Sequence, residues 1–512
     1  MAPSALLSWM TDAAGREDIA VRETKRAVTY GALREGVLAT AAALRAAGVN
    51  AGDRVAIVLP KSIAALECLL ACLVIGAAYV PLDRRVPAGY LRMLLRDLAP
   101  RLAVVTPEIA TSLKADAANP PAQSGLPPLA VPAQGAGASL LLVDEPRNRL
   151  DCPESPNDLA AILYTSGSTG VPKGIMLSTA NISCFTEWAG RTFAVASSDQ
   201  VSSHAPFHFD LSLFDIFCTL AAHGTLHIPD ETTLLFPGAL RNWIADAAIT
   251  VWYSVPAALV YLSARQGMQG LTSLRQILFA GEVFPVPALR RLMTDLPGAQ
   301  YVNLYGPTET NVCTWHRLAS PPESDLAAVP IGLQCDHYEV SIRDETGQTL
   351  PDGETGEICV TGPGVMTGYW QQPALTASSR LPGRDASYRT GDFGYRRDDG
   401  QLMYSGRRDQ QVKSRGQRIE LVTLENTLNA HPAVREAVVI PAAGVGGTRL
   451  LVFATPREAE IDTRILQSFV ANHLPAAYVP HRINWLSELP RSFNGKTDRA
   501  ALRDLARNLP DL

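Results

Sequence analysis

Excess charge, paired cysteines and a long apolar run at the start are all absent from this sequence, and each absence narrows its function. Its 512 residues carry 45 basic and 50 acidic side chains, giving a formal charge of −5. Proteins that bind nucleic acids usually carry a clear basic excess, so this class is excluded. Residues 1–18 contain no basic stretch followed by a long apolar run, so we expect no signal peptide.

The cysteines and the most apolar stretch argue against two further classes of protein. The eight cysteines are scattered and include no Cys-x-x-Cys pair, so we expect reduced, buried thiols in a cytoplasmic protein. Residues 63–82 are long and apolar enough to raise the question of a membrane span. They contain Glu67 and end in Gly-Ala-Ala-Tyr-Val-Pro, which predicts a helix followed by a buried strand. We therefore expect no membrane association.

Amphipathic helices alternate with short apolar strands in the first part of the chain. The pattern predicts helices at 30–47 and 63–75, and strands at 54–59, 79–82 and 102–105. Such alternation is typical of parallel sheets covered by helices. Residues 117–139 are rich in proline, alanine and glycine, which predicts a surface loop.

The pattern changes further along the chain. Helices and strands alternate again from about residue 159 to 320, and short strands with turns follow, at 339–342 and 356–360. After a charged segment, the pattern predicts two helices and two strands, at 421–430, 462–473, 437–440 and 450–453. We therefore predict an α/β protein. A large N-terminal domain (1–405) has two helix-covered sheets and a β-rich sub-domain at about 325–405, and a small α+β C-terminal domain (406–512) follows.

A loop of glycines and hydroxyl residues follows an apolar strand in the N-terminal domain. Residues 162–174 read Ile-Leu-Tyr-Thr-Ser-Gly-Ser-Thr-Gly-Val-Pro-Lys-Gly. Glycines allow backbone N–H groups to turn toward an anion, and serine and threonine hydroxyls add donors. Lys173 adds a positive charge, so the loop is suited to phosphate. Its spacing is not that of a Walker A loop.

This loop resembles the signature loop of the adenylate-forming superfamily, which comprises acyl-CoA synthetases, luciferases and the adenylation domains of nonribosomal peptide synthesis. Other signatures of that superfamily follow in the right order over almost the whole chain. They are Gly76–Asp83 (GAAYVPLD), Asn303–Thr310 (NLYGPTET), Tyr388–Asp392 (YRTGD), Gly406–Lys413 (GRRDQQVK) and Asn494–Arg499 (NGKTDR). The resemblance implies a ligase that joins a carboxylate to ATP, giving an acyl-adenylate and pyrophosphate, and then forms a thioester.

The resemblance also implies which residues bind ATP and Mg²⁺. Tyr305 would stack on the adenine, Asp392 would accept both ribose hydroxyls, and Arg407 would lie near the ribose and phosphate. Thr308 would contact the α-phosphate, and Glu309 would hold Mg²⁺, a hard cation that prefers carboxylate and phosphate oxygens. The loop would bind the β- and γ-phosphates through Thr165, Ser166, Gly167, Ser168, Thr169, Gly170 and Lys173.

A mobile C-terminal domain is part of the same resemblance. Lys496 would bridge the substrate carboxylate and the α-phosphate, a role that suits a compact ammonium group. Because Lys496 belongs to that domain, the domain must close for the reaction, and Asp409 would be the hinge. Val422 and Thr423 replace a Gly-Glu pair that is common in peptide-synthetase domains, a departure that concerns the thioester step and not adenylation.

The segment Phe209–Asp215 (FDLSLFD) indicates the class of substrate. In amino-acid-activating members of the superfamily, an aspartate at the position of Asp210 pairs with the substrate ammonium, because a buried cation needs such a partner. Activators of fatty and aryl acids usually lack it. Asp210 could instead be a turn or cap residue, and Asp215 is expected to be structural.

Matching the motifs in turn gives the expected walls of the amino-acid pocket. They are Asp210, Leu211, Phe214, Tyr253, Leu278, Ala280, Leu304, Val312, Cys313 and Lys496. Apart from Asp210 and Lys496 these residues carry no charge, so the pocket should accept a small apolar side chain. The set resembles that of freestanding L-prolyl adenylating enzymes that load a carrier protein. Phe214 departs from it, because a smaller aliphatic residue is expected there.

The expected reaction is therefore activation of L-proline and its transfer to the phosphopantetheine thiol of a separate carrier protein. A separate carrier is expected because the sequence contains no Gly-x-Asp-Ser carrier motif. The substrate could instead be alanine, another small amino acid or another cyclic imino acid. Two further hypotheses are an acyl- or aryl-CoA ligase and a catalytically silent binding subunit. Intact Lys173, Glu309, Asp392 and Lys496 argue against a silent subunit.

Overall fold

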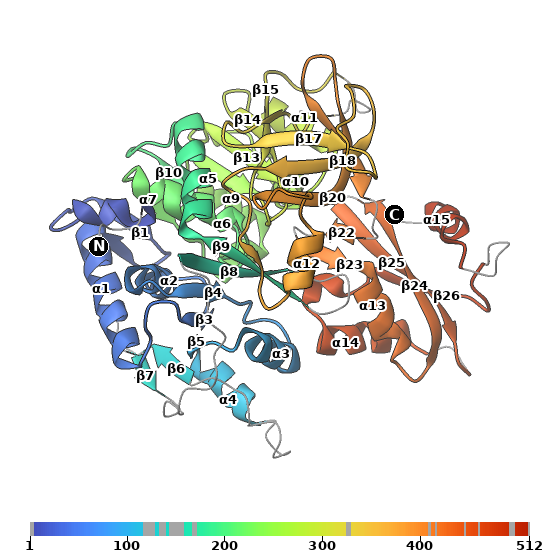
Figure 1. The fold of residues 1–512 in the computed structure, drawn as a ribbon, viewed down its shortest axis with the longest axis horizontal. Coiled ribbons are helices and arrows are strands. Elements are labelled where there is room, and N and C mark those ends of the chain that lie inside the picture. The colour runs from blue at the N-terminus through green and yellow to red at the C-terminus, as the bar shows by residue number, and fades with distance from the viewer. Residues whose placement is uncertain are drawn as a thin grey trace.

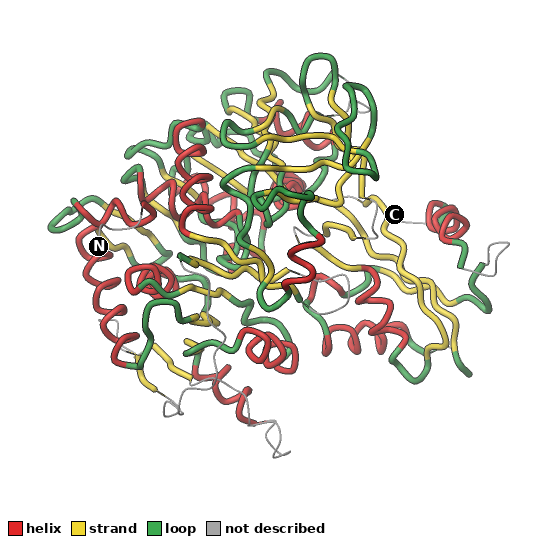
Figure 2. The backbone as a smooth tube through the Cα atoms, viewed as in Figure 1, coloured by secondary structure: helices red, strands yellow, loops and turns green. Residues whose placement is uncertain are grey.

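The computed structural model of the chain describes residues 5–115, 129–132, 140–142, 158–165, 172–323, 329–407, 411–414, 417–444, 447–458, 461–490 and 497–509. Figure 1 shows a large N-terminal part, coloured blue through yellow to light orange, and a smaller C-terminal part in dark orange and red beside it. The strands of each part lie next to one another, and most helices lie outside them, as Figure 2 shows. This arrangement confirms the predicted α/β fold.

The first large sheet has eight strands. They are β3 (Arg54–Val58), β4 (Ala78–Pro81), β5 (Leu102–Val105), β6 (Leu129–Pro132), β7 (Leu140–Leu142), β8 (Leu159–Thr165), β9 (Lys173–Ser178) and β19 (Gly368–Tyr369). Their order is β19-β9-β8-β4-β3-β5-β6-β7, and the strands from β8 to β6 are parallel. The accompanying helices are α1 (Tyr30–Ala46), α2 (Ile63–Ile75), α3 (Ala88–Leu98) and α4 (Pro107–Ala115). Strands β3, β4 and β5 are buried throughout, as expected of a parallel sheet covered on both faces.

The second large sheet has nine strands. They are β1 (Ile19–Arg22), β2 (Ala27–Thr29), β10 (Gln200–Ser202), β11 (Thr225–His227), β12 (Val251–Ser254), β13 (Gln276–Ala280), β14 (Gln300–Tyr305), β15 (Thr314–Leu318) and β16 (Leu333–Gln334). Their order is β16-β15-β14-β13-β12-β10-β11-β1-β2. The strands from β14 to β1 run parallel, so their carboxyl ends share one edge.

Helices surround this second sheet. They are α5 (Thr179–Thr192), α8 (Glu231–Leu235), α9 (Pro237–Asp246), α10 (Pro256–Gln266) and α11 (Val286–Asp295). Another helical segment connects β10 to β11, and it contains α6 (Leu211–Leu213), the π-helical turn η3 (Phe214–Cys218) and α7 (Thr219–Ala221). We call residues 211–221 the linking helix.

A separate antiparallel sheet follows the second large sheet. It contains β17 (Glu339–Arg343), β18 (Gly356–Thr361), β20 (Ser387–Arg396) and β21 (Leu402–Arg407), in that order. A short helix, α12 (Pro373–Ser378), precedes β20. This sheet lies largely within residues 325–405, where the sequence pattern predicted short strands. Because β21 continues to Arg407, the sheet extends past the predicted end of the N-terminal domain at residue 405.

The C-terminal part contains two small sheets and three α-helices among its described residues. Its elements are β22 (Gln411–Ser414), β23 (Gln417–Glu420), α13 (Leu421–Asn429), β24 (Val434–Gly444), β25 (Gly447–Pro456), α14 (Thr463–His473), the 3-10 turn η4 (Ala476–Tyr478), β26 (Arg482–Trp485) and α15 (Arg499–Arg507). Strands β24 and β25 are longer than the predicted strands at 437–440 and 450–453, because their antiparallel pairing continues as far as Gly444 and Gly447. The sequence pattern did not predict β26, which pairs in parallel with β25.

Residues 117–139 were predicted to form a surface loop, and this prediction is wrong for part of the segment. Residues 129–132 form β6, which extends the parallel sheet beside β5. Strand β6 has only four residues, ends in a proline and lies in a proline-rich segment, so the sequence pattern did not predict it. Residues 117–128 and 133–139 lie outside the described residues.

Helix α2 is the apolar segment that raised the question of a membrane span. It begins after the Ser62 cap, whose side chain accepts a hydrogen bond from the Ala65 N–H, and it ends at Gly76, which has a left-handed conformation (φ 83°). Most of its residues are buried on both sides, so it is a core helix. Among the described residues, no helix is long and apolar enough to cross a membrane. No disulfide joins the seven cysteines that the structure describes.

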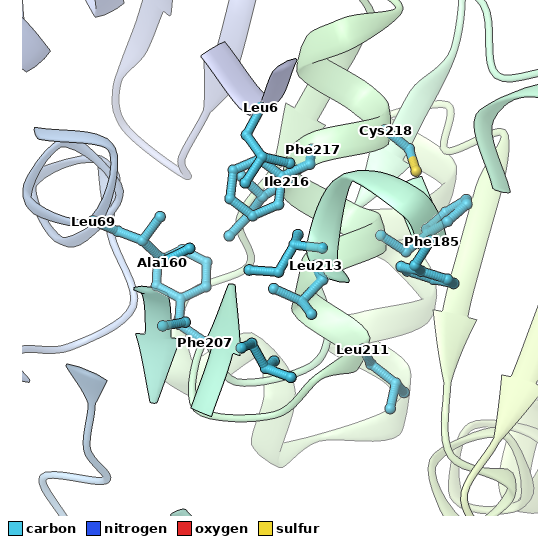
Figure 3. Close-up of a cluster of buried hydrophobic side chains, with 14 of the residues drawn as sticks. Leu6, Leu69, Ala160, Phe185, Phe207, Leu211, Leu213, Ile216, Phe217 and Cys218 are labelled. Atoms are coloured by element: carbon cyan, nitrogen blue, oxygen red, sulfur yellow. The ribbon is translucent and has the colours of Figure 1, made fainter. Parts of the chain in front are cut away.

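The two large sheets share one hydrophobic core. Figure 3 shows part of it, where Leu69 of α2 and Ala160 of β8 face the linking helix. Leu213 and Ile216 of that helix lie at the centre of the view, and Phe207 lies just before it in the chain. The linking helix is therefore held between the two sheets, and Asp210 directly precedes it.

Candidate active site

Three neighbouring parallel strands end at one edge of the second sheet, and each carries a predicted site residue at that end. Tyr253 lies at the end of β12, Ala280 ends β13 and Tyr305 ends β14. Ligands of α/β proteins commonly bind outside the carboxyl ends of parallel strands. Two cavities lie at this edge, and Gly281 lines both of them.

The first cavity has a volume of about 160 Å³, and its walls come from three parts of the molecule. Strands of the first sheet and the residues that follow them contribute Leu82, Asp83, Tyr164 and Thr165. Segments that follow strands of the second sheet contribute His208, Phe209 and Thr308, among others. The C-terminal part contributes Gln417, Pro475 and Tyr478. The cavity is therefore complete only when the C-terminal part lies against both sheets.

The structure divides the predicted amino-acid pocket into two groups. Lining the first cavity are Asp210, Leu211, Tyr253, Ala280 and Val312. The others do not line it: Leu304 lines the second cavity, Lys496 lies outside the described residues, and Phe214, Leu278 and Cys313 are fully buried and line neither cavity. The prediction that these three buried residues form the pocket surface is therefore corrected. Matching motifs along the chain gives neighbours of the pocket, but it cannot say which of them face it.

Phe214 packs behind the cavity wall. Its ring centroid is 5.6 Å from that of Tyr253, at an interplanar angle of 83°, and 6.1 Å from that of Phe193. Both are edge-to-face contacts, a favoured arrangement of aromatic rings. Phe214 therefore affects the cavity through Tyr253 and does not itself narrow the space that a substrate would occupy.

Asp210 supplies a carboxylate to the first cavity. Its side chain makes no capping hydrogen bond to the linking helix, so the structure gives no support to a cap role. Burial raises the pKa of the Tyr253 phenol well above its ordinary value, and the negative charge of Asp210 adds to that increase. The phenol is therefore neutral, and an acidic group stands beside an otherwise apolar wall of Leu211, Ala280 and Val312.

A second carboxylate in the same cavity is balanced by the protein itself. Asp83 accepts two hydrogen bonds of 3.0 Å from Arg85. Burial alone would raise the pKa of Asp83, but the Arg85 hydrogen bonds and the nearby charges outweigh burial and lower it. Nε2 of His208 lies 3.9 Å from Oδ2 of Asp83, and burial lowers the pKa of His208 to about 4. His208 is thus a neutral side chain near pH 7.

The second cavity is larger, at about 740 Å³, and lies where the second sheet, the β-rich sheet and the C-terminal part meet. Its walls include Asn303, Leu304 and Tyr305 of β14, Asp392 of β20, Met403 and Tyr404 of β21, and Val439, Pro441, Arg499 and Arg503 of the C-terminal part. Glu282 also lines this cavity. Aromatic rings and the Asp392 carboxylate are suited to a nucleoside, because a base stacks on rings and a carboxylate accepts hydrogen bonds from sugar hydroxyls.

Tyr305 and Asp392 are joined directly. The Tyr305 hydroxyl donates a hydrogen bond of 2.7 Å to Oδ2 of Asp392, and both residues are buried. Burial raises the pKa of Tyr305, and the neighbouring Asp392 charge raises it further, so the phenol keeps its proton. Arg407 lies directly opposite Asp392 on the neighbouring strand. The structure therefore brings together three residues that are far apart in the sequence.

Glu309 and Lys173 meet at one aromatic residue that the sequence did not identify. The Tyr369 hydroxyl donates a hydrogen bond of 2.7 Å to Oε1 of Glu309, and it lies 3.0 Å from the Tyr388 hydroxyl. Nζ of Lys173 lies over the Tyr369 ring, 5.7 Å from its centroid, within the range of a cation–π contact. Tyr369 therefore links a buried carboxylate to a buried ammonium group.

The described residues fit a magnesium ion that is shared with a phosphate ligand. Glu309 is fully buried, and Tyr369 fixes one of its oxygens. No group of three or more metal-ligating side chains occurs in the part of the chain that the structure describes. Mg²⁺ usually takes one or two carboxylates from the protein and its other ligands from phosphates and water. A single buried carboxylate at this edge meets that requirement.

The base of the glycine-rich loop is well defined. Thr165 ends β8 and Lys173 begins β9, and the two residues are partners across the antiparallel ladder. Thr165 Oγ1 is buried at the first cavity and has no hydrogen-bond partner among the described residues, so it could donate to an anion there. The remaining loop residues, Ser166, Gly167, Ser168, Thr169 and Gly170, lie outside the described residues, as does the hinge candidate Asp409.

The segment after β14 turns sharply, and this turn brings Thr308 and Glu309 to the site. A Cβ atom on Gly306 would lie 1.6 Å from the carbonyl oxygen of Asn311, so no other residue fits there. Asn311 itself has a positive φ of 53°. This close approach places Thr308 at the first cavity while Glu309 faces Tyr369.

The sequence did not reveal several residues at the site. His208 and Tyr164 line the first cavity, and Tyr369 and Tyr404 lie around the nucleotide residues. His208 directly precedes the Phe209–Asp215 motif, so its place in the sequence could have identified it as a neighbour of the site. Tyr369 and Tyr404 lie outside the matched motifs, and only the pairing of strands brings them close.

Comparison with protein families agrees with this geometry. The model described as "AMP-binding enzyme" matches residues 10–370, and the model described as "AMP-binding enzyme C-terminal domain" matches residues 423–496. The L-proline--[L-prolyl-carrier protein] ligase of Streptomyces coelicolor is 37% identical over 92% of this chain and 91% of its own length. The ligase of the same name from Pseudomonas fluorescens is 35% identical over 94% of this chain and 95% of its own length.

Solved structures share the fold. The amide bond synthetase McbA from Marinactinospora thermotolerans has a TM-score of 0.85 and 25% identity, covering 98% of this chain and 99% of that chain. The adenylation domain AlmE from Vibrio cholerae, in complex with glycyl-adenosine-5′-phosphate, has a TM-score of 0.82 and 26% identity, covering 99% of this chain and 97% of that chain. Since these two family models match most of the chain, the chain belongs to the AMP-binding enzyme family of adenylate-forming ligases.

Proposed function

We propose that this chain activates L-proline as the prolyl-adenylate and transfers the prolyl group to the phosphopantetheine thiol of a separate carrier protein. Two relatives named for this activity align with more than nine-tenths of the chain, at 37% and 35% identity. Membership of the AMP-binding enzyme family accounts for the use of ATP.

The observation that carries the proposal is the position of Asp210 in the first cavity. Its carboxylate would pair with the substrate ammonium, and Leu211, Ala280 and Val312 would surround the pyrrolidine ring. A polar side chain on the substrate would lose its hydrogen bonds to water without replacement from these apolar residues. Phe214 differs from the residue expected in prolyl-activating enzymes. Because it lies behind Tyr253, it does not occupy the space proposed for the pyrrolidine ring.

The nucleotide would occupy the second cavity, beside the amino acid. Tyr305 and Tyr404 offer aromatic surfaces to the adenine, and Asp392 would accept the ribose hydroxyls while the Tyr305 hydroxyl holds it in place. Gly281 lines both cavities, so the amino-acid carboxylate and the α-phosphate would meet close to it. This arrangement supports adenylation by proximity and orientation.

In the first step, a carboxylate oxygen of proline attacks the α-phosphorus of ATP, and the bond to pyrophosphate breaks. Both reactants are anions, so cations must lower their repulsion. Thr308 would donate to the α-phosphate, Lys173 would neutralise the outer phosphates, and Lys496 would bridge the two reacting groups. Mg²⁺ held by Glu309 would neutralise phosphate charge when it is bound.

In the second step, the carrier thiol attacks the adenylate carbonyl carbon, and AMP leaves. The thiol needs a path to that carbon, and in this structure the C-terminal part closes the first cavity through Gln417, Pro475 and Tyr478. Rotation about Asp409 would separate these residues from the cavity and open the path. The domain movement is thus part of the proposal.

Amino-acid-dependent exchange of pyrophosphate into ATP tests the first step. The panel would contain L-proline, L-alanine, L-pipecolate, further amino acids and carboxylic acids without an amine. A clear maximum with L-proline is the expected result. A maximum with another amino acid would show that proline is not the substrate, but the reaction would still be amino-acid adenylation. Exchange only with amine-free acids would overturn the role of Asp210 and indicate an acyl- or aryl-CoA ligase.

Mass spectrometry of a carrier protein tests the second step. A phosphopantetheinylated carrier from a prolyl-ligase system would gain the mass of one prolyl group in the presence of enzyme, ATP and L-proline. The same carrier without its phosphopantetheine arm is the matched control and should stay unmodified. Transfer to CoA with none to the carrier would contradict the proposed acceptor.

A further inference from the structure

Lys61 lies in the loop between β3 and α2, and its ammonium group contacts a distant part of the chain. Its Nζ donates hydrogen bonds to the backbone carbonyls of Ser203 and Ala205, the second at 2.5 Å. The same atom lies 5.2 Å from the ring centroid of Phe207, within the range of a cation–π contact. Lys61 therefore connects the first sheet to the segment that follows β10 in the second sheet.

That segment carries a wall of the first cavity. It begins at Ser203 and reaches the linking helix at Asp210, and His208 and Asp210 line the cavity. The Ser203 N–H donates a hydrogen bond of 2.8 Å to the His227 carbonyl, which fixes the beginning of the segment. The carbonyls that Lys61 holds lie between this fixed end and Asp210. A shift of either carbonyl would therefore be passed along a few residues to the Asp210 carboxylate.

A buried carboxyl lies in the linking helix, which this segment enters. Asp215, in the π-helical turn η3, is fully buried, and neither of its carboxyl oxygens has a hydrogen-bond partner among the described residues. Burial raises the pKa of Asp215 well above its ordinary value, and the charge of Lys61 opposes this increase. Burial likewise lowers the pKa of Lys61 to about 7, and Asp215 opposes that decrease.

Stability alone does not explain this pair. Two charged groups lose their hydration on burial, and an apolar pair of the same size is usually as stable or more stable. The ammonium group binds two backbone carbonyls of the cavity segment, and the carboxyl belongs to the helix that the segment enters. π-helical turns are frequent at functional sites. These features connect the pair with the position of Asp210.

We propose that Lys61 is a positioning residue, which holds the segment from Ser203 to Asp210 against the first sheet and thereby sets where the Asp210 carboxylate meets the substrate ammonium, with Asp215 as its buried counter-charge. This inference rests on the amino-acid-activating function proposed above. Lys61 lines neither cavity, so its effect on the reaction would pass through Asp210.

A positioning role predicts a particular change in kinetics. The pairing of Asp210 with the ammonium is present in the bound substrate and in the transition state alike, so weakening it raises KM and leaves kcat almost unchanged. Lys61→Met removes both hydrogen bonds to the carbonyls and keeps most of the side-chain volume. In pyrophosphate exchange with L-proline, we expect KM for the amino acid to rise about tenfold or more, while KM for ATP stays within about twofold.

Arg54 provides a matched control. It is a buried cation that donates hydrogen bonds to the backbone carbonyls of Leu98 and Ala99, and its guanidinium lies over the Trp370 ring, away from the cavity segment. Arg54→Met should lower the melting temperature and leave KM for the amino acid unchanged. An equal rise of KM in both variants would show a general loss of packing and overturn the positioning role.

A double variant separates hydrogen bonding from charge balance. Lys61→Met leaves Asp215 buried without a counter-charge, whereas Lys61→Met combined with Asp215→Leu removes both charges and should recover part of the lost melting temperature. KM for the amino acid should stay raised in the double variant, because the carbonyls are still not held. A return to the wild-type KM would overturn the positioning role. If Lys61→Met does not fold, the double variant and Lys61→Arg are compared in the same way.

The wild-type enzyme distinguishes failure of this inference from failure of the proposed function. Wild-type exchange with L-proline, together with an unchanged KM in Lys61→Met, would overturn only the role of Lys61. An absence of exchange with every amino acid in the wild-type enzyme would overturn the proposed function, and the role of Lys61 with it.

Discussion

The Tyr369 hydroxyl donates a hydrogen bond of 2.7 Å to Oε1 of Glu309, and both groups are buried. Glu309 follows β14 of the second sheet, whereas Tyr369 belongs to β19 of the first sheet. This bond therefore joins the two sheets at the carboxylate that we assign to Mg²⁺. Lys173 packs over the same tyrosine ring, so one aromatic side chain supports two residues of the proposed phosphate site.

Tyr369→Phe should impair adenylation without unfolding the protein. The variant keeps the ring beneath Lys173 and loses the hydrogen bond to Glu309, which then has more freedom to turn away from the metal. A hydrogen bond to a charged group contributes about 1.5–3 kcal/mol, so we expect the exchange rate to fall about 10- to 100-fold. Calorimetric titration of ATP at several Mg²⁺ concentrations should show a higher Mg²⁺ requirement.

Tyr388→Phe is the control for that experiment, because the Tyr388 hydroxyl contacts the Tyr369 hydroxyl. It should have the smaller effect on the Mg²⁺ requirement. Equal effects of the two substitutions would contradict a specific role for the bond between Tyr369 and Glu309.

Asp210→Asn should lower kcat/KM for the amino acid and leave ATP binding intact. The amide keeps the shape of the carboxylate and removes its charge. Removing one partner of a buried ion pair costs about 2–5 kcal/mol, which corresponds to a loss of about 30-fold or more in kcat/KM. Pyrophosphate exchange measures kcat/KM for the amino acid, and calorimetric titration measures the affinity for ATP. Full activity in this variant would remove the basis for an amino-acid substrate.

Phe214→Leu should change substrate choice through Tyr253. The smaller side chain leaves space behind the Tyr253 ring, which can then move back and admit a larger ring such as that of L-pipecolate. The loss of buried volume should lower the free energy of unfolding by about 1–3 kcal/mol. The measurement is the ratio of kcat/KM for pipecolate to that for proline, and we expect it to rise.

Phe193→Leu is the matched control for this substitution. Phe193 contacts Phe214, Trp188 and Trp315 within the same core. The variant should lose comparable stability with little change in the ratio. A similar change of ratio in both variants would argue against transmission through Tyr253.

Acidification should destabilise the protein partly through His208. Burial lowers the pKa of His208 to about 4, whereas an unfolded histidine titrates near 6.5. Between these values the unfolded chain binds more protons than the folded protein, so stability falls as the pH is lowered from about 6.5 to about 4. The contribution of one such group is at most about 1.4 kcal/mol per pH unit.

Urea unfolding of the wild type and His208→Gln across this pH range isolates the contribution of His208. The variant should lose less stability on acidification than the wild type does. His227→Gln should behave in the same way, because burial also lowers the pKa of His227 to about 4. Parallel curves for the wild type and His208→Gln would show that the folded protein binds the proton at His208 without cost.

The sequence alone determined the class of fold and the family, and it supported predictions for the residues of the nucleotide site. The apolar run of residues 63–75 predicted α2, and spacing within the motifs led to the predictions for Tyr305, Glu309 and Asp392. These features are local, because a helical repeat or a motif of a few residues is encoded in consecutive positions. Asp210 was predicted in the same way, from the seven-residue segment that contains it.

Only the tertiary structure decided which side chains face the cavity and what supports them. Phe214 lies four residues after Asp210, yet it is buried behind Tyr253. Tyr369 and Tyr404 reach the site from other strands, Lys61 contacts the Ser203–Asp210 segment from a loop of the first sheet, and no local pattern marks these residues. Their positions depend on the packing of two sheets and a linking helix, so they follow from contacts between residues that are distant in the chain and could not be obtained from spacing.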